Sequence, residues 1–317
     1  MSVLKGSAAT ALYGPLGRNG VIIINTKRAK SGDTKVILNH GTSFETVDLL
    51  PEYQNEYGGG YSTEFDTFEF NPSIHPASWA QFDGQKTPTY KADESWGPKL
   101  DGTPVRHWDS WIQGDSEFGK LRPWSAQPDN IKDFYRRGHT SRTSLTFLKG
   151  SEDYSVKGQI MRTDRNSIVR NSDRNTTQVA FNVKYKITKK LEFYGNANYQ
   201  HRKTNNQLDR NYGNVFSNLN QWWQRQLDMD RVRNYRRGGR ITSWNINSPT
   251  DTQPKYWDSP FFELYENLNT NFRNSTYGTL GLNYKINDEF SANIEIRKRN
   301  TSIKDKDIRD AWGSISG

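Results

Sequence analysis

Apolar and polar residues alternate along much of this chain, and a two-residue period predicts β-strands. Around residue 145, Thr143, Leu145 and Phe147 share one face, while Arg142, Ser144 and Thr146 share the other. The same alternation recurs in six further segments, at residues 35–44, 154–160, 178–185, 191–199, 276–286 and 290–297. Because successive side chains of a strand point to opposite faces, each segment has one apolar and one polar face. Strands of this kind are expected in a sheet whose two faces contact different solvents.

The connections between the predicted strands alternate in length. Lys149–Glu152 and Thr188–Lys190 are tight turns, whereas residues 165–173 form a longer polar loop. Two connections are much longer, at about 51–138 and 206–271, and such long loops are usually functional. Short helices are expected within them: a capped one at Pro128–Phe134, and a partly helical stretch at Asn214–Leu227. Short turns on one side of a sheet and long loops on the other are typical of an outer-membrane β-barrel.

The first 32 residues form a different unit. Ser7–Tyr13 predicts a short helix that ends at Gly14, and Val21–Ile24 predicts a strand. Gly14, Gly17 and Gly20 recur every third residue and indicate a tight turn between them. This spacing resembles a phosphate-binding loop, but a preceding strand, a following helix and the Gly-Lys-Ser/Thr ending are missing. A Gly-x-x-Gly loop that clamps RNA is the other alternative.

The composition narrows the class of protein. Only 32% of the 317 residues are hydrophobic and the mean hydropathy is −0.96, yet 13% are aromatic. Disordered chains are poor in aromatic residues, so disorder explains this composition badly. A polar, aromatic-rich chain fits an outer-membrane barrel, whose lumen is polar and whose rims carry aromatic girdles. No run of about 18 apolar residues predicts a transmembrane helix.

The formal net charge of +9 allows nucleic acid, an anionic membrane or an anionic ligand as a partner. Between Arg225 and Arg240 six Arg stand against two Asp, with Trp222, Trp223 and Tyr235 close by, as in single-strand binding. The other basic residues are spread over the whole chain, however, and we expect no nucleic-acid partner. The absence of Cys and the scattered His leave no metal-ligand spacing. We expect no metal, no cofactor, no catalytic residues and no enzymatic activity.

Two stretches near the N-terminus together resemble a known family. Val3–Gly14 followed by Arg18–Lys27 is similar to the end of the plug in SusC/RagA-type TonB-dependent outer-membrane transporters. Three later stretches also resemble this family, at Glu52–Gly58, Trp96–Gly102 and Pro128–Gly138. This sequence departs from the family's pattern at two places: it has Pro15-Leu16 in the variable turn, and Arg18 where a small residue is common.

The resemblance implies an all-β fold: a partial antiparallel transmembrane β-barrel preceded by the C-terminal remnant of the plug domain. Residues 1–32 would end the plug, and residues 33–317 would form the N-terminal part of the barrel with long extracellular loops at about 51–138 and 206–271. The plug motif would have a structural role, with Gly14, Gly17, Asn19 and Gly20 forming the sharp turn.

The family imports large nutrients, glycans or oligopeptides, across the outer membrane of Bacteroidetes-type bacteria. A SusD-like surface lipoprotein covers the barrel, outer-membrane lipid surrounds it, and TonB with ExbB and ExbD pulls on the N-terminal part of the plug. That part and a signal peptide do not occur in this sequence, so we expect a fragment of the transporter.

Five loop tryptophans are candidates for contact with ligand or lid: Trp96, Trp108, Trp111, Trp222 and Trp223. They could equally hold the loops in a folded structure, because buried aromatic rings contribute strongly to packing. An alternative to the transporter is a soluble or surface-attached glycan-binding β-protein. In that protein the apolar strand faces would meet inside a closed sandwich.

Overall fold

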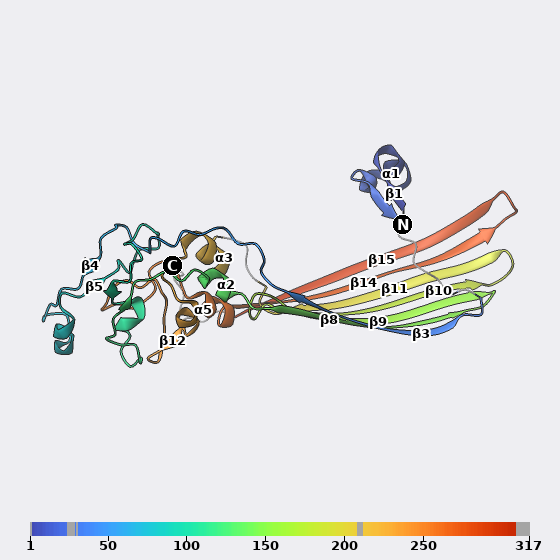
Figure 1. Cartoon of the computed structure of the whole chain (residues 1–317). Helices are drawn as coiled ribbons and strands as arrows, with labels where there is room; N and C mark the ends of the chain where they lie inside the picture. The colour runs from blue at the N-terminus through green and yellow to red at the C-terminus, as the bar shows by residue number, and fades with distance from the viewer. Residues whose placement is uncertain (1, 24–28, 30, 208–211, 309–317) are drawn as a thin grey trace.

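The computed structural model describes residues 2–23, 29, 31–207 and 212–308. Three parts are visible in Figure 1: a small N-terminal unit of residues 2–23, a long curved sheet, and a group of loops at one end of the sheet. We call this group the loop cap; it comprises the described residues of 46–137, 167–173 and 205–267.

The N-terminal unit is a helix between two short paired strands. Its elements are β1 (Ser2–Leu4), α1 (Gly6–Tyr13), the 3₁₀ turn η1 (Gly14–Gly17) and β2 (Val21–Ile23), and β1 pairs antiparallel with β2. The helix ends where predicted, at Gly14, whose φ of +61° suits a residue without a Cβ. Ile24 of the predicted strand and the motif residues Asn25–Lys27 lie outside the described residues.

Seven long strands form one antiparallel sheet in which sequence neighbours are also spatial neighbours. They are β3 (Thr34–Glu45), β8 (Gly138–Gly150), β9 (Tyr154–Asn166), β10 (Arg174–Lys186), β11 (Leu191–Thr204), β14 (Leu268–Lys285) and β15 (Ser291–Ile308). The predicted fold class, an all-β chain built on a barrel-type antiparallel sheet, is confirmed. β14 and β15 are longer than predicted, because polar residues continue the pairing as far as Leu268 opposite Ile308.

Connections of different length lie at opposite ends of the sheet. The chain reverses within residues 151–153, 187–190 and 286–290 at one end. At the other end the connections span residues 46–137, 167–173 and 205–267, and they make up the loop cap (Figure 1). This is the arrangement that the alternating connection lengths predict.

The loop cap contains only short elements. They are β4 (Asp66–Thr67), η2 (Ala77–Phe82), β5 (Lys86–Thr87), β6 (Pro104–Val105), η3 (Trp108–Trp111), β7 (Arg122–Pro123), α2 (Asn130–Phe134), α3 (Val215–Ser217), η4 (Asn218–Trp222), α4 (Met229–Arg233), β12 (Arg236–Arg237), β13 (Arg240–Ile241) and α5 (Pro260–Tyr265). Helix α2 is present as predicted, but the predicted cap is wrong, since Asp129 makes no side-chain cap hydrogen bond. In the second loop Asn214 does cap a helix, accepting from the N–H groups of Phe216 and Ser217.

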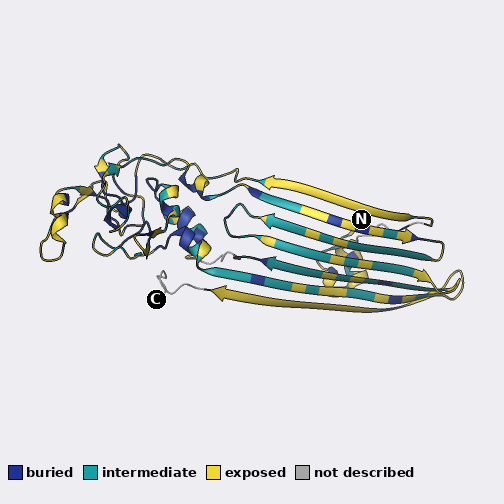
Figure 2. Cartoon of the chain, turned by 90° about the horizontal axis from the view of Figure 1, so that it is seen from below, coloured by how far each residue is buried: buried dark blue, intermediate teal, exposed yellow. Residues whose placement is uncertain are grey.

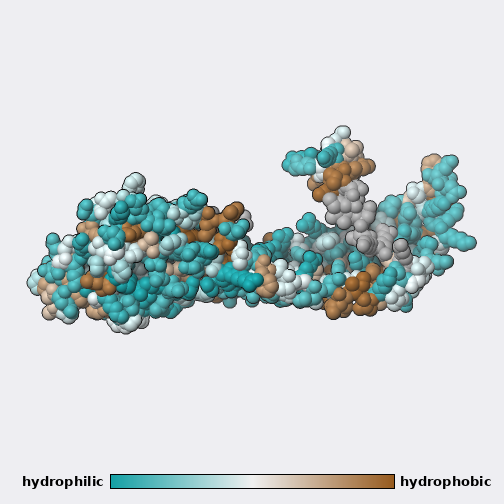
Figure 3. Space-filling model, viewed as in Figure 1, coloured by the Kyte–Doolittle hydropathy of each residue, from teal (hydrophilic) through white to brown (hydrophobic). Residues whose placement is uncertain are grey.

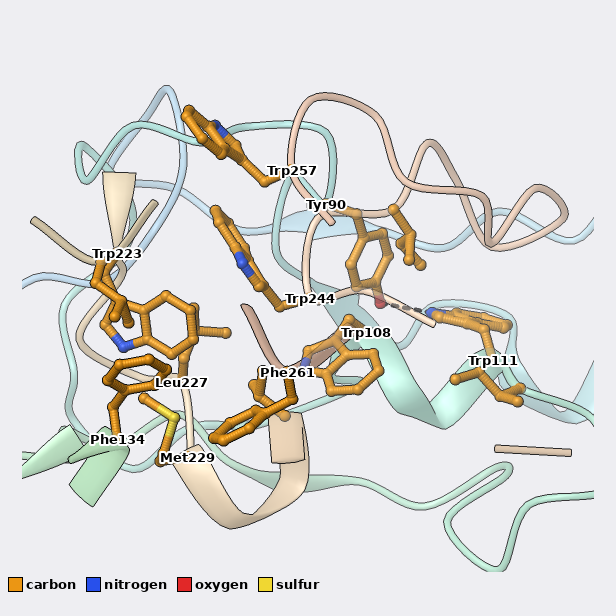
Figure 4. Packing of buried hydrophobic residues seen from close by; sticks show 14 of the residues in the cluster. Tyr90, Trp108, Trp111, Phe134, Trp223, Leu227, Met229, Trp244, Trp257 and Phe261 are labelled. Carbon is orange, nitrogen blue, oxygen red and sulfur yellow. Dashed lines mark hydrogen bonds between the residues drawn. The ribbon is translucent and has the colours of Figure 1, made fainter. Parts of the chain in front are cut away.

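The hydrophobic core of the chain lies in the loop cap and not on the sheet (Figure 2). Rings from both long loops meet there, including Phe134 of the first and Phe261 of the second, with their centroids 5.6 Å apart. The Trp111 Nε1–H donates to the Tyr90 hydroxyl at 2.6 Å (Figure 4). The loops therefore form a folded body with its own apolar interior.

Candidate functional site

One face of the sheet carries a continuous apolar surface that is open to the surroundings. A hydrogen-bonded row crosses Leu145, Ile160 and Val179 on adjacent strands, and these side chains are 42–49% exposed. In Figure 3 apolar side chains gather on the side of the sheet away from the N-terminal unit. The apolar faces of residues 143–199 are therefore not enclosed in a sandwich, which counts against the soluble alternative.

The apolar surface runs obliquely across the hydrogen-bonded rows. The row that starts at Val36 in β3 ends at Lys298 in β15, whereas the apolar residues on this face of β15 are Ile294 and Ile296, nearer the short turns. The row through Ile296 leads back to Thr34 in β3. In a barrel the strands tilt by about 35–45°, so a belt parallel to a flat bilayer must cross the rows at an angle. The drift of the apolar residues from strand to strand has this geometry.

The opposite face of the sheet is mainly polar at its centre, although Met161 and Ala180 also lie on it. Ser144 and Thr146 of β8 are buried on it, and Gln159 Nε2 donates to Thr146 Oγ1 at 3.0 Å. Asn182, Asn196 and Thr279 follow on the neighbouring strands. Strands of 13 residues, such as β8, are about 44 Å long and, at a tilt of about 35–45°, would still span about 31–36 Å along the membrane normal, slightly more than a hydrocarbon core of about 30 Å. The strand ends therefore reach beyond an apolar layer of that thickness.

The predicted plug motif forms a compact turn. A Cβ on Gly17 would collide with the Ala9 carbonyl of helix α1, and Gly20 adopts φ +86° before β2. Gly14 ends the helix, and Asn19 lies in the turn between η1 and β2. The tight-turn interpretation of the glycine spacing fits this backbone, while the role of the motif in a plug stays a prediction.

The five candidate tryptophans do not gather at one surface. Trp108, Trp111 and Trp223 are buried in the core of the loop cap, with exposures of 6%, 2% and 6% (Figure 4). Trp222 is half-buried beside Trp257, and Trp96 is 75% exposed. Burial of the first three supports their structural interpretation, and contact of any of the five with a ligand or lid stays a prediction.

A buried charge network ties the two long loops together, and the sequence analysis did not foresee it. Asp109 is fully buried and accepts from Arg122 Nη2 at 2.6 Å and from Arg231 Nε at 2.8 Å. Burial alone would raise the pKa of Asp109, but the charges of Arg122 and Arg231 outweigh it and hold that pKa below its ordinary value. The loop cap thus holds a carboxylate that stays ionised.

Other arginines of the basic run also pair inside the loop cap. Arg225 is 3% exposed and donates to Asn130 Oδ1 at 2.6 Å, and Arg237 pairs with Asp115 at 3.1 Å. The Arg-rich stretch 225–240 therefore serves largely to join the second loop to the first. The only sequence signal for this pairing is the complementary charge of Asp109 and Asp115 in the distant first loop.

Beside this network lies a small cavity of about 20 Å³, lined by residues of both long loops that include Tyr90, His107, Gln224 and Trp244. This space holds about one water molecule and is too small for a sugar or a peptide. Burial, with a smaller contribution from Arg122, lowers the pKa of His107 from 6.5 to about 4. His107 is therefore neutral within the cap at neutral pH.

Two features of the described residues bear on other classes of protein. No helix in this part of the chain is both long and apolar enough to span a membrane. Within the same residues, no three His, Cys, Asp or Glu side chains gather as metal ligands would.

Comparison with known proteins gives matches in sequence and in fold. No protein-family model matches the chain. The chain is 26% identical over 198 residues to TonB-dependent receptor P3 of Formosa agariphila, a match that covers 61% of this chain and 14% of that protein. Its fold matches the structure of the RagAB peptide importer in the closed-closed state, with a TM-score of 0.57 and 14% identity, over 99% of this chain and 33% of that chain.

These matches confirm the predicted resemblance. In sequence the chain is similar to a TonB-dependent receptor, and in fold it resembles the transporter chain of the RagAB peptide importer, as expected for a SusC/RagA-like TonB-dependent transporter. The chain spans only 14% and 33% of the two matched proteins. The two matched proteins are named as a receptor and as a peptide importer.

Proposed function

We propose that this chain forms part of the wall, the external loops and the end of the plug of a TonB-dependent transporter in the outer membrane. The observation that carries the proposal is the oblique apolar surface, which runs from Val36 and Leu38 in β3 to Ile294 and Ile296 in β15. Lipid would cover this surface, and the polar face would look into the lumen. The loop cap would then lie outside the cell and the short turns in the periplasm.

The cargo would be a large nutrient, a glycan or an oligopeptide. The resemblance to SusC/RagA-type transporters supports both classes, and the fold match to a peptide importer supports the second. A SusD-like surface lipoprotein would sit on the loop cap, where exposed aromatic residues such as Trp96 are available for contact. TonB with ExbB and ExbD would act through a part of the plug that precedes these residues.

The orientation can be tested with protease sites in the product of the complete gene. One variant carries a site after Leu49, which is 89% exposed in the loop cap, and a matched variant carries the same site after Lys189 in a short turn. We expect added protease to cut the first variant on intact cells and the second only after permeabilisation. Cleavage at Lys189 alone on intact cells would contradict this orientation.

A solubility measurement separates the proposal from the glycan-binding alternative. The transporter should be recovered from the outer membrane with detergent. A chain that folds cooperatively as a monomer without detergent would favour the soluble protein.

A further inference from the structure

The polar face of the sheet carries a group of like charges where it meets the loop cap. In the register of β11 and β14, Arg202 lies directly opposite Arg273. Arg174 of β10 lies two residues nearer the cap on the same face, diagonal to Arg202. Both neighbours are close enough for their charges to act on Arg202. Like charges that face each other across a strand pair destabilise the sheet, so this arrangement calls for an anionic partner.

The described residues supply no such partner. The carboxylates on this end of the polar face stand near the sheet edges and are engaged elsewhere: Glu45 pairs with Arg165 at 2.7 Å, and Asp305 accepts from Asn271 at 2.7 Å. No ion pair joins Arg174, Arg202 or Arg273 to a carboxylate within the described part of the chain. Asp305 lies diagonal to Arg273 across β14 and β15, so the arginines are only partly balanced, and positive charge is in excess where β10, β11 and β14 meet the loops of residues 167–173 and 205–267.

One guanidinium N–H and two threonine hydroxyls on this face also lack a hydrogen-bond partner among the described residues. Among the described residues, Arg202 Nε, Thr204 Oγ1 and Thr140 Oγ1 are shielded from solvent and have no hydrogen-bond partner. One row across the strands contains Thr140, Arg165, Arg174 and Thr204, and Arg202 lies two residues from this row on the same face. Donors of this kind, arranged around several guanidinium groups, match the oxygen atoms of a sulfate or carboxylate group.

We propose that Arg174, Arg202 and Arg273 form a subsite for an anionic group, sulfate or carboxylate, of the imported molecule. This inference rests on the proposed function, because the polar face must line the lumen for cargo to reach it. The subsite lies at the loop-cap end of the sheet, where cargo would enter.

The test uses the complete transporter, purified in detergent, with probes that differ in charge. Sulfated and unsulfated dextran oligosaccharides of equal length and a hexaglutamate peptide are titrated by calorimetry. We expect the sulfated glycan, the acidic peptide or both to bind, with an affinity that falls as salt rises. If only the sulfated glycan or only the acidic peptide binds, the result identifies which class of molecule carries the anionic group. The neutral dextran should bind at least about tenfold more weakly.

Variants then assign the binding to the arginines. Arg202→Gln and Arg273→Gln should each weaken binding about tenfold, since a charge-assisted contact is lost. Arg273→Lys keeps the charge and should retain most of the affinity. Lys189→Gln, which removes one charge from a distant turn, should leave binding unchanged. Circular dichroism and thermal unfolding of each variant report on folding.

Thermal unfolding without ligand gives an independent result. If the arginines lack a partner, Arg273→Gln relieves repulsion and raises the unfolding temperature. A lower unfolding temperature together with unchanged binding would show that carboxylates elsewhere in the protein neutralise the arginines, and it would overturn the inference. Failure of the proposed function itself would appear separately, as absence of the complete protein from the outer membrane.

Discussion

Asp109 gives the sharpest test of how the loop cap is held together. Asp109→Asn removes the one buried negative charge that Arg122 and Arg231 share. Breaking a buried ion pair costs about 3–5 kcal/mol when the remaining charge stays buried. The two arginine side chains are 20% and 22% exposed, and Glu117 lies 3.4 Å and 3.1 Å from them, so part of the loss is compensated. We therefore expect local stability to fall by about 2–3 kcal/mol.

Hydrogen exchange followed by mass spectrometry measures this change directly. Amides of η3 and α4 should exchange roughly 30- to 150-fold faster in Asp109→Asn, whereas amides of β9 and β10 should keep their rates. The matched control is Asp230→Asn on α4, where an 80% exposed carboxylate pairs with Arg233 and contributes less than about 1 kcal/mol. Equal exchange rates in the two variants would refute the view that Asp109 joins the loops. Because the pKa of Asp109 is lowered, its contribution is complete at neutral pH and is lost only as the pH falls below about 4.

Three further predictions concern other parts of the molecule. His107 has a pKa of about 4 in the folded cap and an ordinary value of 6.5, so only the unfolded chain takes up its proton between these values. Cap stability should fall by about 2 kcal/mol from pH 7 to pH 5, and His107→Gln should abolish this dependence in hydrogen exchange; an unchanged pH profile would refute the assignment. Phe181→Arg on the apolar face should cost about 2–4 kcal/mol and reduce assembly in the outer membrane, whereas Asn182→Arg on the polar face should assemble normally. Gly17→Ala should displace the turn from the Ala9 carbonyl, at a cost of about 1–3 kcal/mol, and speed proteolysis of the N-terminal unit; equal cleavage rates would contradict the predicted collision.

The sheet could be predicted from the sequence because alternation reports directly on a strand with two different faces. Residues 143–199 follow the period of two closely, and their strands lie where predicted. The start of β14 could not be found this way, since Asn269, Thr270 and Asn271 are all polar. These residues pair because the neighbouring strand continues beside them, and one segment read alone does not contain that information.

The loop cap could not be predicted beyond its short helices. Its core joins Trp111, Trp223 and Phe261 from distant positions, and no local period marks them as buried. The Arg-rich run also permits two interpretations in the sequence, a surface for anions or a set of internal pairs. Its partners, Asp109 and Asp115, are identified only once both loops are folded.

The shared interior of the loop cap has a consequence for the order of folding. Asp109 and Arg231 are 122 residues apart, and the four strands β8, β9, β10 and β11 lie between the loops that carry them. Contacts of such high sequence separation form slowly, because a long stretch of chain must first be brought together. We expect the tryptophan fluorescence of the cap to mature only after β14 has joined β11. A fully folded loop cap would then indicate that this part of the barrel wall has already assembled.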